Sequence, residues 1–198
     1  MIQFVELVND PQCRAIGEIG LEYSSHGHGQ RHMQRKNLEV LLQASQHTNL
    51  PVVIHCRSNP KEDCSVVHED CICILQMYLD STHPIHVHCF SASDHIVQRW
   101  LECFPNVKFG VSGILLNARK PEKQILRTAI SMIPLDSIML ESDSPYLDPH
   151  EQGQSQKEDM NHPWNLRDIA EEVSRLTHVS HMIVLEAARI NASRFYHL

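Results

Sequence analysis

The stretch Ala-Ile-Gly-Glu-Ile-Gly-Leu at residues 15–21 places a single carboxylate inside an otherwise apolar run. A nearly continuous apolar run is typical of a β-strand covered on both faces, because a half-exposed strand alternates apolar and polar side chains. A carboxylate inside such a strand is costly unless it is paired or bound to a cation. We therefore expect Glu18 to take part in a salt bridge or a cation site.

Outward from this strand, short apolar runs alternate with longer segments in which apolar side chains recur three and four residues apart, as on one buried face of a helix. Repeated strand–helix–strand order predicts parallel βα units, so the fold class is α/β. Five strands fit either a doubly wound sheet or part of a (β/α) barrel. The predicted strands are residues 15–21, 51–56, 85–90, 107–111 and 137–141, and the clearest helical stripes run through residues 38–45, 125–133 and 166–176.

Four acidic or imidazole residues fall at or near the C-terminal ends of four different predicted strands, namely Glu18, His55, His88 and Asp143. The C-terminal ends of neighbouring strands converge in βα folds, and sites are built there. One strand-end histidine most often has a structural role, so the prediction depends on the four groups together. Carboxylate and imidazole ligands suit zinc, manganese, magnesium or iron. Two such ions about 4 Å apart can clamp the attacking and leaving oxygens of a phosphodiester.

Length and composition fit one globular domain over residues 1–198. The chain has 24 acidic and 17 basic residues and a formal charge of −7. This charge argues against a protein that binds nucleic acid mainly through a positively charged surface. A nuclease is still allowed, because bound cations reverse the local potential of an acidic pocket. Seven cysteines without the spacing of a secreted module predict a reducing, intracellular location in nucleus or cytoplasm. With no long apolar run and no signal-peptide pattern, we expect no membrane partner.

Four motifs together resemble a known family. They are residues 15–21, the segment Leu-Pro-Val-Val-Ile-His-Cys-Arg at 50–57, His-Cys-Phe-Ser at 88–91, and Glu-Ser-Asp-Ser-Pro-Tyr-Leu at 141–147. In order and spacing they are similar to the TatD-like metal-dependent hydrolases. Any one motif alone is weak, whereas four in one order are specific. The match runs from residue 15 to the C-terminus.

The resemblance implies a TIM-type (β/α)₈ barrel, of which the five strands here are the last five, and hydrolysis of DNA as the substrate. It implies that Glu18 bridges two divalent ions, magnesium, manganese or zinc, and that His55 and His88 complete the second site. Asp143 would bind the first ion and orient or deprotonate the attacking water. Arg57 would face a substrate phosphate, a role that suits its paired donors.

The sequence also departs from the family pattern. Members open with a strand that carries His-x-His and supplies two ligands to the first ion, so we expect the domain to lack its first strands and the first site to be incomplete. The open sheet would then leave bare edges, through which a homodimer could form. Glu22 stands where Asp is usual. Residues 26–28, His-Gly-His, are expected to lie in a solvated loop, and His86 inside the barrel, although either could reach a metal.

Other interpretations stay open at the level of sequence. One is a catalytically impaired remnant or binding protein that keeps one metal pocket, and another is an amide or lactone hydrolase with the same ligands. A cluster of Cys64, His68, Cys71 and Cys73 fits no standard zinc spacing, so free thiols on a helix are expected instead. The long polar stretch at residues 144–163 predicts a loop that sets specificity.

Overall fold

The computed structural model describes residues 2–24, 30–59, 62–117, 122–148 and 160–198. The chain forms two compact units. The first consists of Met1–His88, Gln98–Val107 and Phe195–Leu198, and the second of Cys89–Val97 and Lys108–Arg194. Each unit has its own strands and its own buried core.

Three parallel strands form the sheet of the first unit: β1 (Ile16–Glu22), β2 (Val52–Arg57) and β3 (Ile85–His88). They lie in chain order, with β2 between β1 and β3. The register places Gly20 beside His55 and His55 beside His88. The C-terminal ends of these strands therefore carry polar groups at one level of the sheet.

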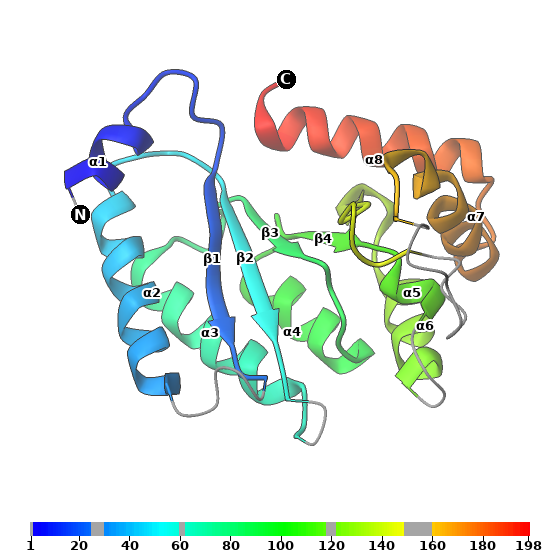
Figure 1. Ribbon diagram of the computed structural model, residues 1–198, viewed down its shortest axis with the longest axis horizontal. Coiled ribbons are helices and arrows are strands. Elements are labelled where there is room, and N and C mark those ends of the chain that lie inside the picture. Colours follow the sequence, from blue (N-terminus) through cyan, green and yellow to red (C-terminus); the bar gives the residue numbers. More distant parts are fainter. Residues whose placement is uncertain (1, 25–29, 60–61, 118–121, 149–159) are drawn as a thin grey trace. The chain divides into compact units, whose positions relative to one another are not determined.

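Helices α2 (Arg31–Ser45) and α3 (Ser65–Tyr78) pack against this sheet, and α1 (Ile2–Val8) packs against α2 (Figure 1). Apolar side chains spaced along one face of α2 and α3 fill the space beneath the strands, which explains why these segments form helices here. The buried side chains of this core include Leu38, Leu42, Ile54, Val67, Ile72, Leu75, Ile85 and Val87.

The second unit contains the parallel pair β4 (Lys108–Val111) and β5 (Ile138–Leu140). A buried contact between Phe90 and Phe109, with ring centroids 5.1 Å apart, lies at its centre. Its helical segments are α5 (Ile114–Asn117), α6 (Glu122–Met132), η2 (Leu135–Ser137), η3 (Pro163–Asn165) and α7 (Leu166–Thr177), and it holds parts of α4 (Asp94–Cys103) and α8 (His181–Tyr196).

The prediction of five parallel strands with flanking helices is confirmed, and each strand lies within two residues of its predicted bounds. The segment 85–90 ends as a strand at His88, because Cys89 has a left-handed backbone with φ of 46°. Residues 26–28, and residues 149–159 of the predicted loop, lie outside the described part of the chain. Among the described helices, none has the length and apolar character to cross a membrane.

The cysteine and histidine cluster on α3 is structural in the first unit. His68 is buried, and its Nδ1 accepts a hydrogen bond from Nε1 of the fully buried Trp100 at 3.2 Å. All seven cysteines are free thiols, as predicted. His86 is also buried, and its Nδ1 lies 2.8 Å from the Tyr196 hydroxyl, in agreement with its expected place in the interior.

His68 predicts a pH-dependent stability. Burial lowers its pKa to about 3, whereas the unfolded chain protonates it near pH 6.5. The unfolded state therefore binds the extra proton, and stability falls as the pH drops below 6.5, by roughly 1.4 kcal/mol per pH unit. Denaturant unfolding of the wild-type chain and of His68→Asn, which keeps an acceptor for Trp100, measures this. The variant should lose that part of the pH slope; identical slopes between pH 6.5 and 4.5 would contradict the assignment.

Candidate metal centre

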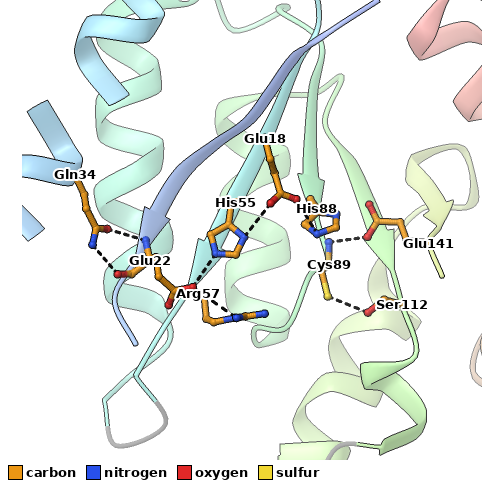
Figure 2. Close-up of polar contacts among 9 residues, drawn as sticks. All are labelled: Glu18, Glu22, Gln34, His55, Arg57, His88, Cys89, Ser112 and Glu141. Atoms are coloured by element: carbon orange, nitrogen blue, oxygen red, sulfur yellow. Dashed lines mark hydrogen bonds and ion pairs between the residues drawn. The ribbon is translucent and has the colours of Figure 1, made fainter. Parts of the chain in front are cut away.

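Glu18 lies between two imidazole rings at the strand ends of the first unit (Figure 2). Its Oε1 is 2.8 Å from Nε2 of His88, and its Oε2 is 3.6 Å from Nδ1 of His55. All three side chains are partly exposed, between 22% and 43%, so a small ligand from solvent can reach them. Three of the four predicted metal ligands are therefore brought together.

The strand register explains this meeting. Glu18, Gly20 and Glu22 alternate onto one face of β1, and Gly20 pairs with His55 of β2. A Cβ at Gly20 would lie 1.9 Å from the backbone oxygen of His55, and its φ of +154° disfavours other residues. Glycine at this position therefore lets β1 approach β2 closely enough for Glu18 to meet both rings.

Glu22 adds a second carboxylate on the other side of the His55 ring. Its Oε2 lies 3.1 Å from Nε2 of His55 and 3.6 Å from the guanidinium of Arg57. Burial raises the pKa of Glu22, but hydrogen bonds with Ser24 and His55 and the charge of Arg57 lower it more, so the net pKa is lowered. Glu22 is thus an ionised acceptor at neutral pH.

Gln34 fixes the backbone of Glu22. Its side-chain oxygen accepts a hydrogen bond from the Glu22 N–H, and its Nε2 donates to the Glu22 carbonyl, both at 2.8 Å. Helix α2 therefore holds the end of β1 in place. A cavity of about 420 Å³ lies beside these residues. It is lined by Glu18, Glu22, Gln34, Asn37, Leu38, Leu41 and His55.

The donor set fits a divalent cation. A carboxylate only accepts hydrogen bonds, and a neutral imidazole has a single N–H to donate. Nε2 of His55 faces Glu22 and its Nδ1 faces Glu18, so each ring nitrogen lies beside a carboxylate oxygen. A divalent cation would find both oxygen and imidazole ligands here, and Glu22 would then be the outer carboxylate that orients a ligating histidine. Oxygen and imidazole donors of this kind suit manganese, zinc or magnesium.

Asp143 and its neighbours belong to the second unit. A carboxylate oxygen of Asp143 and Sγ of Cys89 lie within 4.8 Å of each other. The Cys89 N–H donates to Glu141 at 2.7 Å, and its Sγ lies 3.0 Å from the Ser112 hydroxyl. Burial is the main cause that raises the pKa of Cys89 to about 12, with Asp143 and Glu141 adding to it. Cys89 is therefore a neutral thiol rather than a nucleophilic thiolate.

The sequence pattern marks Glu18, His55 and His88, but two further contacts are missing from it. Glu22 stands in the sequence only as a departure from a motif, although its spacing of four from Glu18 puts both on one strand face. No pattern marks the contact of Cys89 with Asp143 in the second unit. Arg57 has a side chain 59% exposed beside Glu22, where a substrate group can reach it.

A family model described as TatD related DNase matches residues 1–197. The chain belongs to this family. The resemblance of the four sequence motifs is therefore confirmed.

Two curated relatives illustrate the similarity. The human 3'-5' RNA nuclease TATDN2 is 30% identical over 194 residues, which cover 98% of this chain and 24% of that protein. The 3'-5' ssDNA/RNA exonuclease TatD of Salmonella typhimurium is 26% identical over 170 residues, which cover 86% of this chain and 60% of that protein. The chain thus matches less than two thirds of the length of either relative.

Solved structures agree on the fold. A TatD homologue from Escherichia coli K12 superposes with a TM-score of 0.78 at 23% identity, covering all of this chain and 70% of that one. An uncharacterised amidohydrolase from Saccharomyces cerevisiae gives a TM-score of 0.79 at 19% identity, with coverage of 98% and 68%. The predicted TIM-type barrel architecture of TatD-like proteins is therefore confirmed for the strands that this chain contains.

The outer carboxylate can be tested by removing its charge. Glu22→Gln should weaken Mn²⁺ binding by about 10- to 100-fold, because His55 loses the carboxylate that orients it. Glu22→Asp keeps the charge and should bind more tightly than Glu22→Gln. Isothermal titration with Mn²⁺ measures both, and Glu102→Gln on the exposed face of α4 makes the same charge change elsewhere. Equal affinities in Glu22→Gln and Glu102→Gln would show that Glu22 has no such role.

Proposed function

We propose that the chain hydrolyses phosphodiester bonds of single-stranded DNA or RNA with a divalent metal ion. The observation that carries this proposal is the Glu18 carboxylate set between the rings of His55 and His88, beside a cavity that Glu18 and His55 line. Membership of the TatD related DNase family supports it. The names of the human and Salmonella relatives, a 3'-5' RNA nuclease and a 3'-5' ssDNA/RNA exonuclease, favour attack from the 3′ end.

The residues of the first unit have separate roles in this proposal. Glu18, His55 and His88 would hold magnesium, manganese or zinc, and Glu18 has two oxygens with which to bridge a second ion. A bound divalent ion lowers the pKa of a water molecule and polarises the phosphoryl oxygen. Glu22 keeps His55 in one orientation, and this fixed geometry removes the cost of reorganising the site during the reaction.

Two further roles complete the proposal. Arg57, with its side chain more than half exposed, would bind a phosphate oxygen of the substrate through its paired N–H donors. Asp143 is proposed, on its sequence motif alone, as the residue that orients the attacking water. With a formal charge of −7, the chain should gain little substrate affinity from bulk charge, and bound metal ions should raise that affinity.

A homodimer is proposed from the edge of the first unit's sheet. Among the described strands β1 pairs only with β2, and at its other edge Gln34 binds the N–H and the carbonyl of Glu22. A strand of a second copy would pair with the remainder of this edge.

The nuclease proposal predicts the loss of activity in specific variants. A 5′-labelled single-stranded oligonucleotide should shorten from its 3′ end in Mg²⁺ or Mn²⁺, and EDTA should stop the reaction. His55→Ala and Asp143→Ala should each lower the rate by at least about 100-fold, since positioned groups of this kind contribute on that scale. Gel analysis of the products measures rate and polarity.

Matched control variants distinguish the loss of a site residue from a general loss of folding. Cys71→Ser changes a buried thiol of α3 and should keep the metal-dependent rate. Arg57→Ala should raise KM for the oligonucleotide while Mn²⁺ affinity stays the same, and Arg57→Lys should restore it only in part. Equal rates in His55→Ala, Asp143→Ala and Cys71→Ser would contradict the assigned site. Turnover of carbonyl substrates alone would favour an amide or lactone hydrolase.

The dimer predicts a particular mass in solution. Light scattering coupled to size exclusion should give about twice the chain mass of 22.7 kDa, with a shift toward the single-chain mass on dilution. A mass of one chain at all concentrations would contradict the dimer, and the nuclease assay on that monomer would then show whether pairing is needed.

A further inference from the structure

An exposed tryptophan stands out in the second unit. Trp164 is 72% exposed, and its indole stacks on the imidazole of His162 with ring centroids 4.0 Å apart and planes 20° apart. Tyr146, in the turn after Asp143, is 76% exposed. Rings of this size normally contribute to stability by burial, whereas these two present most of their surface to a ligand from solvent.

Buried asparagines hold the Trp164 segment firmly. Asn161 is 2% exposed, and its side-chain amide contacts the carbonyl oxygens of Ser142, Tyr146 and Leu147. Its side-chain oxygen accepts a hydrogen bond from Asn165 at 3.0 Å. Trp164 lies between these two asparagines, so its backbone is anchored while its ring stays in solvent.

The backbone on both sides of Trp164 is also fixed. Pro163 begins the short helix η3, where its ring restricts φ, and α7 follows at once. The stacked ring of His162 further limits the rotation of the indole. A flat aromatic surface held in one orientation loses little conformational entropy when another flat ring binds to it.

The same turn carries Asp143. The Tyr146 N–H donates to the Asp143 carbonyl at 2.7 Å, and the Asn161 N–H donates to the Pro145 carbonyl at 3.2 Å. Trp164 is thus built onto the turn that follows the proposed water-orienting residue, within a single unit of the fold.

We infer that Trp164, backed by His162, is a stacking platform for an unpaired base of a nucleic-acid substrate. The inference rests on the proposed nuclease function. It adds that the protein recognises an unpaired base of the substrate. Every base has a π-face, so stacking tolerates any sequence but requires an unpaired base. A negatively charged chain gains affinity in this way without relying on bulk positive charge.

The chain provides its own spectroscopic probe. It has two tryptophans, and Trp100 is fully buried with its Nε1 bonded to His68. Fluorescence that responds to a solvent-borne ligand therefore reports on Trp164. A single-stranded decathymidylate in EDTA should quench this emission. A decamer of stable abasic nucleotides, which has the same phosphates and no bases, should not.

Binding of labelled oligonucleotides tests the role in affinity. The wild-type chain should bind decathymidylate about tenfold or more tightly than the abasic decamer, as expected for one stacked base. Trp164→Ala should reduce the first affinity to the second, and Trp164→Phe should restore much of it. Met182→Ala, on another exposed apolar side chain of the second unit, should change neither. Equal affinities for the two oligonucleotides, or no effect of Trp164→Ala, would overturn the platform.

Hydrolysis of the abasic decamer in Mn²⁺ separates the two proposals. Trp164→Ala should cleave it as fast as the wild-type chain, since no base is present to stack. If neither protein cleaves any oligonucleotide but base-dependent quenching persists, the nuclease proposal fails and the platform stands. If cleavage occurs without base-dependent quenching, the nuclease stands and the platform fails.

Discussion

The arrangement of Glu18 between His55 and His88 is the constraint on which the functional account depends. The Glu18 carboxylate faces two imidazoles, and one of them, His55, also faces Glu22. Gly20 permits this arrangement because only a residue without a side chain fits against the backbone of His55. The strand register and the glycine therefore bring together side chains of the kinds that bind divalent cations.

Much of this was readable from the sequence because the relevant patterns are local. Apolar runs predicted the five strands to within two residues, and helical stripes predicted α2, α6 and α7. The rule that strand ends converge then placed Glu18, His55 and His88 at one edge of a sheet. Family motifs added the expected roles, and the match to the family model confirmed the family.

Other features depend on contacts that no sequence period encodes. The pairing of Glu22 with His55 follows from the register between β1 and β2, which a single strand does not specify. The stack of His162 on Trp164 depends on the buried hydrogen bonds of Asn161, which join residues 14 to 19 positions apart. The two compact units also have no mark in the sequence, because contact density between elements is a property of the packed chain.

The central claim is that Glu18, His55 and His88 hold one divalent cation. Anomalous X-ray scattering from crystals of the full chain grown with Mn²⁺ tests it most directly. The account predicts a manganese peak within coordination distance of a Glu18 oxygen and of ring nitrogens of His55 and His88. A peak elsewhere, or those three side chains ordered with no peak among them, would contradict it.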